Sequence, residues 1–314
     1  MKRKMKGTMS IIVCICSVLL LIPACTAGLY QQKIIEKDKT SQSTSQPQYW
    51  GLLFAVGVYL NNPDKDRPEM LEACDDLYAT LLDSPQYWQV NNIHVVKGSQ
   101  ATLQNLIKEL LWLRRNSKSE DYVVVYLTTH GGQLKDAHYA PWDIPPKDEA
   151  DGSDEVLMMY NGFDKWYGVI WDDALNFFLS IIKCKGLCLI VDSCYSGGFN
   201  DPPLNAFNPK DQGTFTADSF TKGFVKDMSA ENRIVLMSTE ENCVSYGTYF
   251  SNFLIEGFSG SGDSNGNHDG INSAEEAFSY AAPWTYWWVL FNTGEEQNPT
   301  ISDNYPGEFP VTIS

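Results

Sequence analysis

The sequence predicts an α/β fold, with a mostly parallel central sheet and helices on both of its faces. Short apolar runs alternate along the chain with longer segments in which apolar residues recur every three or four positions. Most of the short runs are continuously apolar and rich in β-branched residues, which is typical of strands that are buried on both faces. Parallel sheets bind ligands at the carboxyl ends of their strands, so we expect functional residues there.

Each predicted element follows from its local pattern. Strands are expected where apolar, β-branched and aromatic residues cluster, at 50–59, 92–96, 122–128, 188–192 and 233–239. Helices are expected where one face is apolar, at 68–82, 102–115, 172–182, 249–258 and 273–282. The segment 133–170 is predicted to be a long loop with its acidic stretch, 147–155, in solvent, and Trp284, Trp287 and Trp288 are expected to pack against other elements. These elements form one predicted domain over 49–314.

Residues 1–27 are predicted to be an export signal, and a membrane anchor is the alternative. Four cations lie within the first six residues, an apolar run follows, and small residues cluster at 24–28. The apolar run is shorter than the roughly 20 residues of a spanning helix, which favours the signal. The stretch before Cys25 also resembles a bacterial lipobox, which would attach the protein to a membrane by a lipid on Cys25; plain cleavage after Ala27 is the alternative.

The polar segment 28–48 is predicted to be a linker, because it is rich in Gln, Ser, Thr and Lys and contains little that a core could bury. We therefore expect an exported protein, either extracellular or at the cell surface. The chain of 314 residues has 39 acidic and 23 basic residues and a net charge of −16, which excludes a general nucleic-acid binder. Eight cysteines reduce to five beyond the signal region, and an odd number leaves at least one thiol without an intramolecular partner.

An imidazole and a thiol follow two of the predicted strands. His130 follows 122–128 in the sequence Thr-His-Gly-Gly, and Cys194 follows 188–192 in Asp-Ser-Cys-Tyr-Ser-Gly-Gly. Both should therefore lie at one edge of the sheet, where the imidazole can take the thiol proton and produce a nucleophile. The glycines are expected to let the backbone turn sharply, and the N–H groups of Gly131 and Cys194 are candidate donors to an oxyanion.

An apolar strand ending in His-Gly, followed by an apolar strand ending in Asp-Ser-Cys-x-Ser-Gly, resembles the caspase-like cysteine peptidases, which include the metacaspases and legumain-type peptidases. The resemblance covers roughly residues 50–258. It implies a caspase-like three-layer sandwich and an endopeptidase that cleaves proteins or peptides, with Cys194 as nucleophile and His130 as base. Where legumain-type members have Ser-Asn-Gly, this chain has Val-Tyr-Leu at 58–60, so Tyr59 or Asn61 is the candidate to orient the imidazole.

Asp192 lies two residues before the candidate nucleophile. In metacaspase-like members the acidic residue at this place faces the pocket for the residue that precedes the cleaved bond, which implies a preference for Arg or Lys. Legumain-type members also carry an acidic residue there and prefer Asn. The alternative is that Asp192 only caps the turn that follows it, as aspartate often does.

Residues 263–276 fit the template of an EF-hand calcium loop, with Asn at the first position in place of Asp. The candidate ligands are Asp263, Asn265, Asn267, Asp269, Ile271 and Glu276. A polar turn before a helix is the alternative. The sequence also leaves open a second function, that of a catalytically inactive, caspase-like, calcium-binding surface protein that acts as a binding module.

Overall fold

The computed structural model describes residues 46–134, 142–144, 147, 154–165, 167–195, 228–239 and 245–314, except for the side chains of Gln133, Cys194 and Tyr195. Residues 46–314 form one compact unit. The predicted export signal, Cys25 and the predicted linker up to residue 45 lie outside the described residues. Among the described helices, none combines the length and the apolar character that crossing a membrane requires.

The sheet has the strand order β2-β1-β3-β6-β7-β9. Its strands are β1 (Tyr49–Ala55), β2 (Ile93–Lys97), β3 (Tyr122–Gln133), β6 (Gly186–Tyr195), β7 (Arg233–Met237) and β9 (Thr300–Asp303). All neighbouring pairs in this order are parallel except β7 and β9. Two short antiparallel strands, β4 (Glu155–Met158) and β5 (Val169–Trp171), extend the sheet from the end of β3. The predicted mostly parallel sheet is confirmed.

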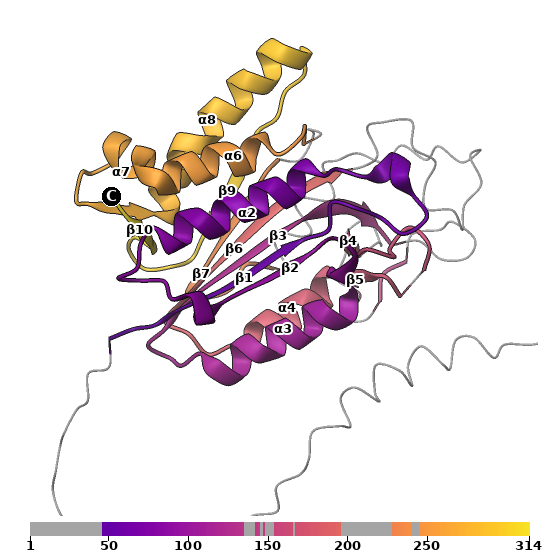
Figure 1. Ribbon diagram of the computed structural model, residues 1–314, viewed down its shortest axis with the longest axis horizontal. Coiled ribbons are helices and arrows are strands. Elements are labelled where there is room, and N and C mark those ends of the chain that lie inside the picture. The colour runs from indigo at the N-terminus through magenta and orange to yellow at the C-terminus, as the bar shows by residue number, and fades with distance from the viewer. Residues whose placement is uncertain are drawn as a thin grey trace, which may run out of the picture. The chain divides into compact units, whose positions relative to one another are not determined.

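Helices cover both faces of the sheet (Figure 1). One face carries α2 (Glu69–Leu82), α6 (Tyr249–Glu256) and α8 (Ala274–Thr293), and the other carries α3 (Leu103–Asn116) and α4 (Asp172–Ser180). Each helical layer buries its own apolar cluster against the sheet. Smaller elements are η1 (Pro63–Lys65), η2 (Val90–Asn92), η3 (Gly98–Gln100), η4 (Gly257–Ser261), α7 (Gly262–Asn265) and the antiparallel pair β8 (Ile271–Ser273) and β10 (Pro310–Ile313). The fold is the three-layer α/β sandwich that the sequence predicts.

The structure corrects several predicted boundaries. β3 and β6 continue past residues 128 and 192, so the glycines after His130 extend the strand instead of turning it. The predicted loop 133–170 contains β4 and β5, which are too short to show a periodic pattern. Helix α8 continues through Pro283 to Gly294, whose φ of 78° ends it. Its tryptophans are about half exposed, but Trp284 and Trp288 pack against α6, which confirms the predicted packing between elements for these two.

We expect a Gly57→Ala variant to unfold more easily than the parent. Gly57, two residues after the end of β1, has a φ of 61°, and an added Cβ would lie 2.8 Å from the Leu71 side chain and 3.1 Å from the Arg67 carbonyl oxygen. Strain of this kind costs about 1–3 kcal/mol, which urea denaturation would measure. Gly98→Ala is the control, since Gly98 has a φ of 58° but its nearest neighbour would be 3.5 Å away. An equal loss in both variants would show that crowding at Gly57 has no effect.

Candidate active site

The two candidate catalytic residues are paired in register across the sheet. Parallel strands β3 and β6 align His130 with Cys194. Adjacent strands lie about 4.8 Å apart, so the two backbones are immediate neighbours. Both residues lie among the last residues of long strands, and neither lies in a loop. The side chain of Cys194 lies outside the described part of the structure, so its role as nucleophile stays a prediction.

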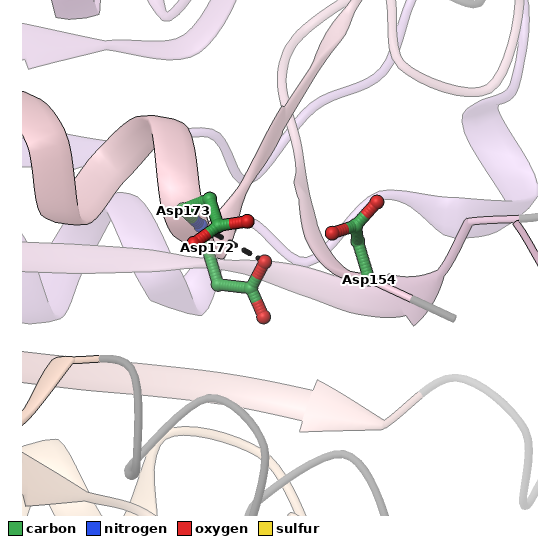
Figure 2. Close-up of side chains that lie close together, drawn as sticks. All are labelled: Asp154, Asp172 and Asp173. Carbon is green, nitrogen blue, oxygen red and sulfur yellow. Dashed lines mark hydrogen bonds between the residues drawn. The ribbon is translucent and has the colours of Figure 1, made fainter. Parts of the chain in front are cut away.

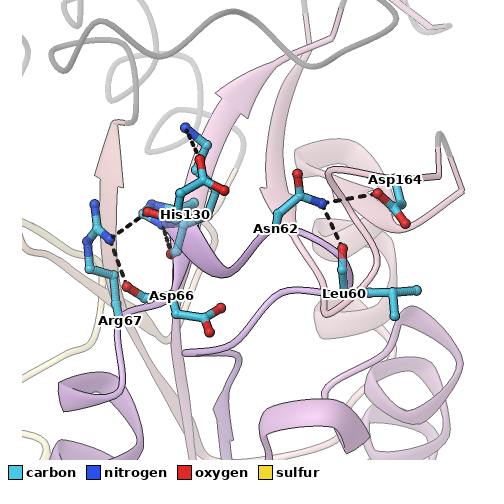
Figure 3. A network of polar contacts seen from close by, with 8 residues as sticks. Leu60, Asn62, Asp66, Arg67, His130 and Asp164 are labelled. Atoms are coloured by element: carbon cyan, nitrogen blue, oxygen red, sulfur yellow. Dashed lines mark hydrogen bonds and ion pairs between the residues drawn. The ribbon is translucent and has the colours of Figure 1, made fainter.

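The imidazole of His130 is fixed by a backbone carbonyl. The ring is buried, and its Nε2 lies 2.9 Å from the carbonyl oxygen of Lys65 (Figure 3). A carbonyl oxygen only accepts hydrogen bonds, so Nε2 must carry the hydrogen and donate it. In the neutral ring, the lone pair is then on Nδ1, which is the nitrogen left to act as a base.

The segment that supplies this carbonyl is itself held in place. Lys65 ends the short helix η1, and the backbone N–H of Tyr59 donates to the Asp66 carboxylate at 2.8 Å. The Arg67 guanidinium donates to the Asp66 carbonyl at 2.7 Å, as Figure 3 shows. These bonds leave the Lys65 carbonyl few alternative positions. The sequence could not reveal this partner, because every residue has a backbone carbonyl.

Tyr59 contacts His130 through its hydroxyl and its ring, but not through an imidazole nitrogen. Its hydroxyl accepts a hydrogen bond from the His130 backbone N–H at 3.0 Å and lies 3.0 Å from Thr129 Oγ1. Its ring lies 5.1 Å from the imidazole, centroid to centroid. The other candidate, Asn61, donates to the Asp164 carboxylate instead. Tyr59 therefore positions the strand that carries His130.

Asp192 is a fully buried carboxylate on the same strand as Cys194. It accepts hydrogen bonds from the backbone N–H and the hydroxyl of Ser251, in α6, and from the hydroxyl of Ser245 at 3.4 Å. Burial raises the pKa of this carboxyl, and the hydrogen bonds from Ser251 and Ser238 partly offset the rise. Asp192 lies two residues before Cys194 on β6. The described donors to Asp192 come from α6 and the segment before it.

Gly131 and Gly132 have partners on the neighbouring strands. Gly131 is aligned with Tyr195 on one side and with Leu157 of β4 on the other. An added Cβ on Gly132 would lie 2.9 Å from the end of the Met158 side chain. Glycine at 132 therefore allows close packing of β4. The candidate oxyanion donors, the N–H groups of Gly131 and Cys194, stay predictions.

A cluster of three carboxylates lies beside the same strands. Carboxylate oxygens of Asp154, Asp172 and Asp173 lie within 4.8 Å of one another (Figure 2). Asp154 is 1% exposed, and its Oδ1 has no hydrogen-bond partner among the described residues. Burial, followed by the charges of Asp172, Asp143 and Asp173, raises the pKa of Asp154 to about 7. The prediction that 147–155 is a solvent-exposed tip is wrong at Asp154 and Glu155, since both are buried.

Comparison with known proteins shows which family this arrangement resembles. Residues 80–203 match the family model described as metacaspase, peptidase C14 domain. The caspase-1 structure from Spodoptera frugiperda superposes with a TM-score of 0.52, 11% identity, and coverage of 90% of this chain and 98% of that one. A protein of Geobacter sulfurreducens also has a TM-score of 0.52, with 15% identity over 85% of this chain and 99% of that one. The folded region therefore has the fold of the caspases, and residues 80–203 resemble the metacaspase peptidase domain.

Curated proteins show the same likeness to metacaspases over part of the chain. The chain is 34% identical to Metacaspase-1 of Plasmodium falciparum over 181 residues, which are 55% of this chain and 28% of that protein. It is 33% identical to Metacaspase-1 of Ajellomyces capsulatus over 107 residues, which are 33% of this chain and 27% of that protein. The chain thus spans about a quarter of the length of the curated relatives that it matches.

In this caspase-like domain, the carboxylate cluster is directly connected to the histidine strand. Strand β4 pairs with the residues that follow His130, because Gly131 is aligned with Leu157 and Gly132 with Val156. The backbone N–H of Leu134 donates to the Asp154 carbonyl at 2.8 Å. Oxygen ligands in this arrangement suit a hard divalent cation such as Ca²⁺. A cation held there would stabilise β4 beside the end of β3.

The predicted calcium loop, 263–276, runs from α7 through β8 into the start of α8. Asp263 Oδ1 accepts from the Gly270 N–H at 3.1 Å, and Asp269 Oδ1 accepts from the Ile271 N–H at 2.9 Å. Glu276 receives the N–H of Asn267 at 2.8 Å and forms a capping box with Ser273 at the start of α8. The Asn265 side chain donates to the Ser261 carbonyl, and the Asn267 side chain donates to Glu308.

The acidic groups of this loop do not converge. Within the described residues, the one group of three or more acidic, His or Cys side chains with ligand atoms close enough to share a metal ion is the Asp154 cluster. Strand β8, which carries the loop residues 271–273, pairs with β10. Strand β10 thus takes the place of the second loop with which an EF-hand loop normally pairs. The calcium site of this loop stays a prediction.

Proposed function

We propose that the protein is an exported cysteine endopeptidase that uses Cys194 and His130. The observation that carries this proposal is the alignment of the two residues on adjacent parallel strands, with Nε2 of His130 donating to the Lys65 carbonyl. That hydrogen bond leaves Nδ1 as the proton acceptor. The match of residues 80–203 to the metacaspase model supports the same chemistry and suggests protein or peptide substrates.

The reaction follows the general scheme of thiol peptidases. The imidazole of His130 takes the thiol proton of Cys194, and the thiolate attacks the carbonyl carbon of the cleaved bond. Backbone N–H groups, for which Gly131 and Cys194 are our candidates, stabilise the oxyanion. The imidazolium then gives its proton to the leaving amine, and water releases the acyl group from Cys194.

Asp192 is our candidate for the base of the specificity pocket. A carboxylate that is buried, yet surrounded by hydroxyl and N–H donors, would gain most from a cationic substrate side chain. We therefore favour Arg or Lys before the cleaved bond, and Asn is the alternative. Nothing in this arrangement favours an acidic substrate side chain, because two carboxylates would repel each other.

Fluorogenic peptides that differ only in the residue before the cleaved bond test the activity. We expect turnover of the Arg or Lys peptide and none of the Asp peptide, together with labelling of Cys194 by a thiol-directed activity probe. If the protein, with calcium present, cleaves none of the peptides and is not labelled by the probe, the peptidase proposal is contradicted and the inactive binding module is favoured. The Cys194→Ala variant is the control for contaminating peptidases.

We expect calcium to stabilise the protein and to raise its activity. The Asp154 cluster and the 263–276 loop are separate candidate sites, so Asp172→Asn and Asp263→Asn distinguish them. A ligand at about 100 times its dissociation constant raises the free energy of unfolding by about 2.7 kcal/mol, and a thermal melt with and without calcium measures it. Asp76→Asn, at an exposed site, is the control. Unchanged melting of the parent upon addition of calcium would contradict both sites.

We also propose that residues 1–27 direct export, either with membrane attachment through a lipid on Cys25 or with cleavage after Ala27. The support is the order of cations, apolar run and small residues at the N-terminus. Intact-mass measurement of the protein from its native host separates the two outcomes. A lipid on Cys25 adds acyl mass and moves the protein to the membrane fraction, whereas plain cleavage gives an unmodified chain beginning at Gly28.

A further inference from the structure

The C-terminal half of α8 presents an exposed aromatic stripe. Trp284, Trp287 and Trp288 are 46–51% exposed, and Phe291 is 79% exposed. Residues separated by three, four and seven positions lie on one face of a helix, so the four rings form one continuous surface. An apolar surface of this kind usually marks a binding site.

The stripe lies at the catalytic edge of the domain. Trp288 contacts Tyr249 of α6 at 6.1 Å between ring centroids, and Trp284 stacks on Phe253 of α6 at 6.2 Å. Between these two α6 residues is Ser251, which donates to Asp192. Helix α6 therefore separates the stripe from the specificity residue, and a helix with its side chains is about 10 Å across.

A second connection joins the stripe to the same pocket. Just after α8, the buried Gln297 donates to the Ser238 carbonyl at 2.8 Å and to the Ser245 hydroxyl at 3.2 Å. Ser245 in turn donates to Asp192. The segment that follows the stripe is thus tied to groups around the specificity residue, and α8 extends past its neighbours at this end (Figure 1).

The charge around the stripe restricts what can bind there. No charged residue occurs from Ala277 to Gly294, and Glu295 and Glu296 follow directly. The hydroxyls of Tyr280 and Tyr286, on the same helix, donate to Glu256 and Glu296. An apolar surface with an acidic rim, on a chain of net charge −16, favours an apolar segment with basic neighbours and disfavours an anionic bilayer or a second acidic copy.

We propose that the aromatic stripe is a second binding surface for the polypeptide substrate, which recognises an apolar, basic-flanked segment outside the residues next to the cleaved bond. This inference rests on the proposed peptidase function. The separation of about 10 Å corresponds to about three residues of extended chain, so substrates of two or three residues would not reach the stripe.

Two peptides with the same residues at the cleaved bond test the proposal. One has about three residues, and the other has about twelve and carries an apolar, basic-flanked segment. We expect W287A/F291A to lower kcat/KM for the long peptide about tenfold, through KM, and to leave the short peptide unchanged. The control is Phe177→Ala, which removes an exposed aromatic ring from α4 on the opposite face of the sheet. Equal effects on both peptides, or none on either, would overturn the inference.

A binding measurement separates this inference from the proposed function. In the Cys194→Ala background, the long peptide should shift the tryptophan fluorescence, and W287A/F291A should weaken that binding about tenfold. If the parent cleaves neither peptide but this binding is retained, the peptidase proposal fails and the binding surface stands. Sedimentation of the parent and of W287A/F291A, alone and with vesicles, tests whether a second copy of the chain or a lipid surface binds the stripe instead. A dimer, or binding to phosphatidylcholine vesicles, that depends on Trp287 and Phe291 would overturn the inference.

Discussion

Replacing either Cys194 or His130 by Ala is expected to lower kcat/KM by at least a thousandfold, or about 4 kcal/mol of transition-state stabilisation. The thiol without its base stays largely protonated, and the base without the thiol has no nucleophile to activate. Groups that act as one unit lose their contributions together, so the double variant should be no slower than the slower single variant. Steady-state cleavage of the preferred fluorogenic peptide measures all three.

The same variants should remain folded. The His130 ring lies among Tyr59 and Phe163, so its loss costs some packing, whereas Cys194→Ala removes only a sulfur atom. Circular dichroism melts distinguish loss of chemistry from loss of fold. A multiplicative loss in the double variant would mean that the two side chains act independently and would contradict the dyad.

Asp192→Asn is expected to lower kcat/KM for Arg and Lys peptides by about two orders of magnitude. A substrate cation paired with a buried carboxylate loses a charge-assisted interaction worth about 2–5 kcal/mol when the carboxylate becomes an amide. Peptides with Asn before the cleaved bond should change much less, because an amide can still exchange hydrogen bonds. The ratio of the two specificity constants is the measurement.

The stability of the same variant provides a separate check. Burial raises the pKa of Asp192, which means that the folded state disfavours its charge, so a neutral Asn should not lower the free energy of unfolding. Asp121→Asn is the matched control. Asp121 is also a buried carboxylate, but it accepts from the Gln48 and Lys118 N–H groups at the opposite edge of the sheet. That variant should lose stability and keep its specificity. Equal specificity changes in both variants would exclude Asp192 from the pocket.

The fold and the alignment of His130 with Cys194 were predictable because both depend on patterns that a sequence displays. Continuous apolar runs determine the parallel strands, and the ends of two such runs bring His130 and Cys194 into register. The long strands β3 and β6 differ from the prediction only at their ends, which include glycines (Gly131, Gly132 and Gly186), and glycine is depleted in strands.

The parts that were missed depend on contacts without a sequence signature. The Lys65 carbonyl that orients the imidazole could belong to any residue type. Asp154, Asp172 and Asp173 come together because β4, of four residues, returns along the end of β3. Four residues are too few to distinguish a strand from a loop, so Asp154 was placed in solvent. The helix expected at 273–282 continues through Pro283 to Thr293, and the exposure of the aromatic stripe was not anticipated.

The strand pair β8–β10 has a consequence for the order in which the chain folds. The Trp88 indole donates to the Val311 carbonyl, and the Ile313 N–H donates to the Ser84 hydroxyl, across 223 and 229 residues of sequence. Contacts of such separation form late, since the chain must first close very large loops. The end of α2 therefore remains uncovered until residues 310–313 have emerged during synthesis. The domain should therefore reach its final packing only after residues 310–313 have been synthesised.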